Sequence, residues 1–360
     1  MNSTQADNYI QSTLRKIYPQ DQSWRDQAVK RLEQLTMPHW AMGDFMDLAV
    51  QLAGIYRTLT PKVASKRIVV MAGDHGVTAE GVSCFPAEVT TQMVHNIIQG
   101  GAAINAMARQ AGAEVLVVDM GACDTFASLQ GEAGFLSRKI SGGTANIAQG
   151  PAMSRTHAVM AVEAGIQVAD MLAEQVDVFG TGEMGIGNTT PATAIAAVLT
   201  GKSTAELTGS GTGISASQKQ NKIQVIDRAL TVNRPDPADG MDILAKVGGF
   251  EIGGIAGLIL GAASNRKAVV VDGFISTAGA LIAYAIEPFV RDYIICSHQS
   301  AEPGHRFMLE KLRRDPLFSL NMRLGEGTGA AFAMNGLEAA VGLLTEVATF
   351  TEAAVSGKEQ

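Results

Sequence analysis

The chain has 360 residues, of which 46% are hydrophobic and 18% charged, and this length and composition can bury a large core. Its formal net charge of −7 argues against nucleic-acid binding, which requires a basic surface. The N-terminal sequence MNSTQAD lacks the apolar segment of a signal peptide, and the apolar run 252–263 is too short to cross a membrane. We therefore expect a protein that binds neither nucleic acid nor a membrane.

The three cysteines, Cys84, Cys123 and Cys296, are odd in number and follow no regular spacing. A disulfide framework or a zinc ribbon needs paired cysteines at characteristic intervals. The sequence therefore predicts neither, and unpaired thiols fit a reducing compartment, the cytoplasm.

The expected elements begin with helices and continue as strands that alternate with helices. Residues 1 to about 60 show helical periodicity, best seen in 44–54, and the chain is helical again from about residue 330. Between these segments lie five short apolar runs, each ending in a polar or glycine-rich turn: 68–72, 115–119, 176–179, 268–271 and 293–296. Strands that are apolar throughout and alternate with helices predict an α/β fold, a parallel Rossmann-like sheet with helices on both faces.

This pattern predicts two domains. Residues 1–60 together with 331–360 would form a small helical domain, and residues 61–330 a large α/β catalytic domain. In open parallel sheets, ligands bind beyond the carboxyl ends of the strands. Several acids and histidines follow the expected strands, namely Asp74, His75, Asp272, His298 and His305, but their spacing matches no metal signature, so we expect no metal.

Two glycine-rich loops have the composition of anion sites. The segment 183–191 follows an expected strand and offers backbone N–H groups, hydroxyls and a helix that begins near Thr190 and Pro191. A plain strand-to-helix turn is the alternative, but Glu183 and Asn188 add polar groups that such a turn does not need. The second loop, 209–213, precedes a helical pattern over 215–229 that contains Lys222.

Two other glycine motifs carry less weight. Residues 180–185 match the GxGxxG pattern of NAD-dependent oxidoreductases, but the following helix begins too late and no second strand ends in an acid at the required distance. Residues 201–204, GKST, resemble the end of a phosphate-binding loop without its upstream glycine. We interpret them as a helix C-terminus followed by an N-cap at Ser203 or Thr204.

The segment 322–330, MRLGEGTGA, places one carboxylate, Glu326, between glycines just before an alanine-rich helical pattern. Flanking glycines allow positive φ and a close approach of other groups to the backbone. Taken alone, Glu326 is as well suited to capping the helix as to acting as a catalytic base in a cleft.

Six stretches in the same order resemble one family, the nicotinate-nucleotide–dimethylbenzimidazole phosphoribosyltransferases of cobalamin biosynthesis (the CobT family). The resemblance spans nearly the whole chain and is weakest in the first sixty residues. It is carried by residues 72–83, 142–146, 182–190, 272–279, 297–305 and 324–329. It implies a homodimer that transfers the 5-phosphoribosyl group of nicotinate mononucleotide to 5,6-dimethylbenzimidazole, giving α-ribazole 5′-phosphate and nicotinate. The chemistry of this transfer requires neither a metal nor a redox cofactor.

The resemblance also implies which residues act. Glu326 would be the catalytic base, assisted by Glu183 and Lys222. The implied substrate-binding residues are Ser83, Gln92, Leu324, Gly185, Gly187, Asn188, Thr189, Gly211, Thr212, Gly213 and Ser300. Two alternatives stay open from the residues alone, an NAD-dependent oxidoreductase built on residues 180–185 and a non-catalytic nucleotide-binding module.

Overall fold

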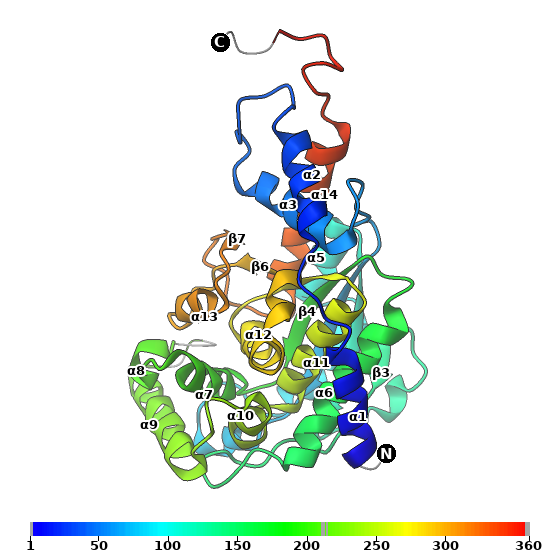
Figure 1. Ribbon diagram of the computed structural model, residues 1–360. Coiled ribbons are helices and arrows are strands. Elements are labelled where there is room, and N and C mark those ends of the chain that lie inside the picture. The colour runs from blue at the N-terminus through cyan, green and yellow to red at the C-terminus, as the bar shows by residue number, and fades with distance from the viewer. Residues whose placement is uncertain (1–2, 210–212, 214, 357–360) are drawn as a thin grey trace.

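A computed structural model describes residues 3–209, 213 and 215–356. The described part forms one seven-stranded, entirely parallel sheet with helices on both faces (Figure 1). Its strand order is β3-β2-β1-β4-β5-β6-β7. The strands are β1 (Lys66–Gly73), β2 (Ala113–Gly121), β3 (Phe135–Ser137), β4 (Val178–Met184), β5 (Ala268–Val271), β6 (Ile294–His298) and β7 (Pro316–Phe318).

Helices precede, separate and follow the strands. They are α1 (Ser3–Leu14), α2 (Gln22–Leu32), α3 (Asp44–Tyr56), α4 (Val89–Ile98), α5 (Ala103–Ala111), α6 (Arg155–Leu172), α7 (Thr189–Thr200), α8 (Thr204–Leu207), α9 (Ala216–Asn233), α10 (Gly240–Val247), α11 (Phe250–Ser264), α12 (Phe274–Ile286), α13 (His305–Leu312) and α14 (Thr328–Glu346). Three short 3₁₀ helices are η1 (Gly76–Glu80), η2 (Ala127–Leu129) and η3 (Pro288–Tyr293).

The predicted α/β fold is confirmed, and all five apolar runs contribute to strands. The run 176–179 was misplaced, because β4 begins at Val178 and continues through Met184. The two edge strands, β3 and β7, were not predicted. Each has only three residues and pairs with a single neighbour, and β7 begins with Pro316, which has no N–H for the ladder. Such short segments carry too few residues for a recognisable period.

The strand order reverses between β1 and β4. From β1 the chain adds β2 and β3 on one side, and from β4 it adds β5, β6 and β7 on the other. At such a switch point the connections leave in opposite directions and open a crevice beyond the carboxyl ends of the strands. Ala72 pairs with Met184 at this end of the β1–β4 ladder, so the crevice begins next to Gly73 and Gly185.

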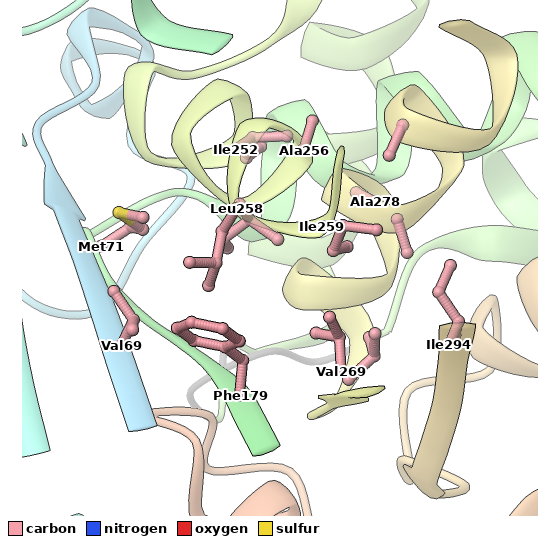
Figure 2. Close-up of a cluster of buried hydrophobic side chains, with 14 of the residues drawn as sticks. Val69, Met71, Phe179, Ile252, Ala256, Leu258, Ile259, Val269, Ala278 and Ile294 are labelled. Carbon is pink, nitrogen blue, oxygen red and sulfur yellow. The ribbon is translucent and has the colours of Figure 1, made fainter. Parts of the chain in front are cut away.

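The core of the molecule is built around α11. Figure 2 shows Ile252, Leu258 and Ile259 of this helix over side chains of the sheet, including Val69 and Phe179. All its residues from Phe250 to Ala263 are buried, which explains the long apolar run in the sequence. Among the described residues, no helix is long and apolar enough to cross a membrane.

Glycines on α6 and α11 let these two helices touch through their backbones. A Cβ at Gly257 would lie 2.0 Å from the carbonyl oxygen of Val162, and one at Gly165 would lie 2.1 Å from that of Gly254. No side chain fits at either position. The opposite face of the sheet is covered by α14, because a Cβ at Gly180 would meet Ala330 and Met334 while the adjacent Phe179 faces α11.

Helices from both ends of the chain meet beyond the sheet. Figure 1 shows α2 and α3 beside the C-terminal part of α14, and α14 packs against both. In contrast, α1 lies on α6 at the far end of the body. The contacts among α2, α3 and α14 favour the predicted small domain of residues 1–60 with 331–360. The contacts of α1 with α6 instead favour placing α1 in the large domain of residues 61–330. The division into two domains stays a prediction.

Candidate active site

A cleft of about 340 Å³ opens beyond the carboxyl ends of the central strands. Side chains and backbone from β4, α4, α7, α12 and the turns after β5, β6 and β7 line it. The lining residues are Phe85, Val89, Met93, Glu183, Met184, Gly185, Ile186, Asn188, Thr189, Asp272, Gly273, Phe274, Ile275, Ser276, His298, Ser300, Glu302, Arg323, Leu324, Gly325 and Glu326. The wall is therefore mostly apolar with a few acidic groups, as expected of a small-molecule site.

Glu326 lies in this wall on an unusual turn. Three consecutive residues, Gly325, Glu326 and Gly327, have φ angles of +88°, +61° and +95°. Glycine adopts this region freely, but for glutamate it is strained. Gly182 on β4 allows the turn to pack closely, because a Cβ there would lie 2.4 Å from the carbonyl oxygen of Glu326. The glycine-rich sequence thus places one carboxylate over the end of β4.

Helix α14 is capped by a residue other than Glu326. The carboxylate of Asp272, at the end of β5, accepts hydrogen bonds from the N–H groups of Gly329 (2.7 Å) and Ala330 (3.1 Å). The carboxylate of Glu326 instead faces the start of α5, where its Oε2 accepts the N–H of Ile104 at 3.2 Å. Of the two roles that the sequence left equal for Glu326, capping therefore belongs to Asp272.

Glu183, near the end of β4, joins two loops of the site. Its Oε1 accepts the backbone N–H of Glu326 at 3.4 Å, and its Oε2 accepts the side-chain amide of Asn188. Burial raises the pKa of Glu183 to about 8, against the opposing effect of the Asn188 hydrogen bond. Burial also raises the pKa of Glu326, while the Ile104 hydrogen bond opposes the shift. Both carboxyls are thus brought toward the range useful in proton transfer at neutral pH.

Lys222 is buried on α9, with 2% of its surface exposed. Its Nζ donates to the hydroxyl of Thr189, in the first turn of α7. Burial lowers the pKa of Lys222 to about 8, and the charge of Glu302 partly opposes the shift. Lys222 is not among the residues that line the cleft, but its partner Thr189 is. A cationic group beside a helix N-terminus is suited to binding an anion such as phosphate.

Only some of the other predicted substrate-binding residues line the cleft. Leu324 and Gly185 line the cleft, as does Ser300, whose N–H donates to His305 Nδ1 at 2.8 Å. The cleft lining does not include Ser83, Gln92 or Gly187; Ser83 is half-buried and Gln92 exposed. Gly213 is exposed with φ of +106°, and Gly211 and Thr212 lie outside the described residues.

The sequence missed most of the apolar wall. Phe85 precedes α4, and Val89 and Met93 lie one turn apart on the face of α4 that meets the cleft. The i, i+4 spacing of Val89 and Met93 was visible, but the same pattern suits any helix packed on a core. Phe274 and Ile275 line the cleft from the first turn of α12.

The acids and histidines considered as metal ligands have other partners. Nε2 of His75 lies 2.7 Å from Glu251 Oε1, and His305 Nε2 lies 2.9 Å from the hydroxyl of Thr277. Burial lowers the pKa of His298 to about 4 and that of His305 to about 3, so both imidazoles are neutral at pH 7. These side chains therefore act as hydrogen-bonded parts of the strand ends.

The GxGxxG motif is not a turn. Residues 180–184 lie within β4, and α7 begins only at Thr189. A dinucleotide-binding turn would need its first glycine between strand and helix. The geometry of this segment therefore does not fit the oxidoreductase alternative.

Comparison with known proteins agrees with this geometry. Residues 17–355 match a family model described as phosphoribosyltransferase. The nicotinate-nucleotide–dimethylbenzimidazole phosphoribosyltransferase of Desulfotalea psychrophila is 58% identical over 98% of this chain and 99% of its own. The enzyme of the same name from Syntrophotalea carbinolica is 56% identical over 97% and 99%. This chain belongs to the nicotinate-nucleotide–dimethylbenzimidazole phosphoribosyltransferase (CobT) family.

The fold agrees as well. The crystal structure of CobT from Thermus thermophilus superposes with a TM-score of 0.89 at 43% identity, covering 93% of this chain and all of that one. The resemblance seen in six sequence stretches is thereby confirmed over nearly the whole chain, and the comparisons support neither alternative, oxidoreductase or non-catalytic module.

The raised pKa of Glu183 predicts a pH-dependent stability. Between about pH 4.5 and 8 the folded protein keeps a proton on Glu183 that the unfolded chain releases, so the unfolding free energy falls as pH rises through this window. Glu183→Gln removes this proton and should flatten the slope by up to about 1.4 kcal/mol per pH unit. Urea unfolding at pH 5, 6.5 and 8 gives the unfolding free energy of wild type and variant at each pH. An equal dependence of this free energy on pH in the two proteins would contradict the raised pKa of Glu183.

Proposed function

We propose that this chain transfers the 5-phosphoribosyl group of nicotinate mononucleotide to 5,6-dimethylbenzimidazole. The products are α-ribazole 5′-phosphate and nicotinate, and the reaction inverts C1′ from β to α. It belongs to assembly of the nucleotide loop of cobalamin. The observation that carries the proposal is the buried carboxylate of Glu326, held away from the helix cap at the wall of a largely apolar cleft.

This carboxylate suits the chemistry. In nicotinate mononucleotide the ring nitrogen is a pyridinium, so it leaves as a neutral ring when the bond to C1′ breaks. A benzimidazole nitrogen forms the new bond, and the ring would become cationic unless its second nitrogen loses a proton. Glu326 accepts that proton as general base. Its apolar surroundings raise its pKa and so make it a better base than an exposed carboxylate.

The remaining groups bind and position the substrates. Lys222 and the first turn of α7 hold the 5′-phosphate, with the 185–190 loop around the nucleotide. The apolar side chains of Phe85, Val89 and Leu324 form a slot for a flat aromatic ring. Holding two substrates in line accounts for much of the rate. The proposed chemistry uses neither a metal nor a redox cofactor.

One assay tests the activity directly. Purified protein is incubated with nicotinate mononucleotide and 5,6-dimethylbenzimidazole, and the products are separated by chromatography. We expect α-ribazole 5′-phosphate and nicotinate in equal amounts. Absence of both products, with nucleotide binding intact, would favour a nucleotide-binding module; a fluorescence titration with NAD tests the oxidoreductase alternative in parallel.

We also propose that the protein is a homodimer in the cytoplasm. The dimer follows from family likeness, and the location fits Cys84, Cys123 and Cys296, which are all free thiols. We expect light scattering to give twice the chain mass of 37.7 kDa. A monomer mass at micromolar concentration would contradict the dimer.

A further inference from the structure

The turn that carries Glu326 is not stable by itself. A glutamate with φ of +61° between two left-handed glycines occupies a strained region, at a cost on the order of 1 kcal/mol. Such a conformation persists only where the surroundings hold it in place. Two buried carboxyls contact this turn: Glu183 accepts the N–H of Glu326, and Asp272 accepts the N–H of Gly327 at 3.1 Å.

The two oxygens of Asp272 have different partners. Oδ1 accepts the N–H groups of Gly329 and Ala330, in the first turn of α14, and Oδ2 accepts the N–H of Gly327, the residue directly after Glu326. One carboxylate therefore fixes the start of the helix with one oxygen and the end of the Glu326 turn with the other. Gly327 is the N-cap residue of α14, so this third bond belongs both to the start of the helix and to the turn that carries Glu326.

Asp272 is itself held firmly. Its N–H donates to the hydroxyl of Thr181 on β4 at 3.1 Å, and its carbonyl oxygen accepts the hydroxyl of Ser297 on β6 at 2.9 Å. Asp272 is 1% exposed. These two bonds tie the backbone of Asp272 to β4 and β6, the strands on either side of β5, and so fix the position from which its side chain extends.

Asp272 also packs closely against Gly329 and His298. A Cβ at Gly329 would lie 2.8 Å from Asp272 Oδ1 and 2.1 Å from His298 Nδ1. Because His298 is neutral at pH 7, its ring supplies no counter-charge. The three N–H groups and the N-terminal dipole of α14 stabilise the negative charge instead. Burial raises the pKa of Asp272 to about 7, and the hydrogen bonds from these N–H groups oppose the shift.

We propose that Asp272 is the positioning residue for Glu326, and that its Oδ2 bond to Gly327 holds the turn in its left-handed conformation. This inference rests on the proposed function, in which Glu326 is the base. A shift of the carboxylate by about 1 Å can cost about 100-fold in rate without weakening substrate binding. The role is therefore separable from helix capping by kinetics.

Asp272→Asn separates the two roles. The amide oxygen can keep both bonds at Oδ1, but the NH₂ group then faces the N–H of Gly327 and cannot accept it. We expect kcat to fall by about 10- to 100-fold. The KM for nicotinate mononucleotide, and its Kd from calorimetry, should stay within about threefold of wild type, because the proposed nucleotide contacts at Lys222 and the 185–190 loop do not include Asp272.

The control is Asp119→Asn. Asp119 is also fully buried at a strand end, where Oδ1 accepts the N–H of Ala122 and Oδ2 pairs with Lys139 at 3.1 Å, and it does not line the cleft. This variant should keep kcat even if it loses stability. An unchanged kcat in Asp272→Asn, or a loss confined to KM, would overturn the inference.

A second pair of variants applies if Asp272→Asn does not fold. Thr181→Val removes the hydroxyl that accepts the N–H of Asp272, and Thr181→Ser keeps it. We expect a several-fold lower kcat for the valine variant and near wild-type kcat for the serine variant. Equal kcat in the two would count against the inference. Failure of the proposed function is distinct, because the wild-type protein would then form no product.

Discussion

Glu326→Gln should lower kcat by about 10²- to 10⁴-fold, the range that a positioned general base contributes. Glutamine has nearly the same shape, and its amide oxygen can still accept the N–H of Ile104. The turn, the cap of α14 by Asp272 and the nucleotide contacts should therefore survive. Only the proton acceptor for the benzimidazole N–H is lost, so the Kd for nicotinate mononucleotide should change little.

Steady-state kinetics together with calorimetric binding of the nucleotide measure this effect. Glu346→Gln is the matched control, because it makes the same chemical change at an exposed position, the last residue of α14. Turnover close to wild type in Glu326→Gln would remove Glu326 as the base and direct attention to Glu183, another buried carboxyl of the cleft.

The pH profile provides an independent check on the same residue. Because the pKa of Glu326 is raised by burial, the acid limb of kcat/KM should lie above the usual range of a glutamate. The base is active only when ionised, so activity is lost as pH falls through that limb. The residual activity of Glu326→Gln should lack this limb, and an unchanged limb would assign it to another group.

Lys222→Met should raise the KM for nicotinate mononucleotide by about 10- to 150-fold, as expected for loss of a charge-assisted hydrogen bond of about 1.5–3 kcal/mol. Methionine fills much of the volume of the buried side chain but cannot contact the 5′-phosphate. The effect on kcat should be smaller, since the phosphate keeps its position throughout the reaction. The change also leaves Glu302 without the nearby positive charge.

The control for this variant is Lys219→Met, one turn earlier on α9 at a partly exposed position. It should leave both kinetic constants unchanged. A KM for nicotinate mononucleotide that does not move in Lys222→Met would show that Lys222 only packs α9 against Thr189.

Residues that act through local sequence were predictable. The strand β5 was predicted with its observed bounds, because four consecutive apolar residues between turns leave few alternatives. The helix start near Thr190 and a cap at Ser203 or Thr204 were also predicted. The structure has α7 from Thr189, and Ser203 caps α8 in a capping box with Glu206. Proline, glycine and capping residues act within a few positions of the chain, so their effects can be read locally.

The partners of buried polar groups were not predictable in this way. Asp272 was grouped with unassigned acids at strand ends, yet it lies against α14, more than fifty residues further along the chain. Ser83 and Gln92 were placed in the substrate pocket by resemblance, while the cleft is lined by their neighbours Phe85 and Met93. Which side of a helix or loop meets a cleft depends on how the element packs, and that is decided by distant residues.

The sequence by itself determined the parallel sheet, the glycine-flanked carboxylate and the family, because these depend on periodicity and on local backbone freedom. The tertiary structure decided what Glu326 does. Packing of α14 against β5 assigned the helix cap to Asp272, and packing of α5 and β4 around the turn left the carboxylate of Glu326 facing the cleft wall. Its environment, and hence its raised pKa, arises from burial by segments far apart in the chain.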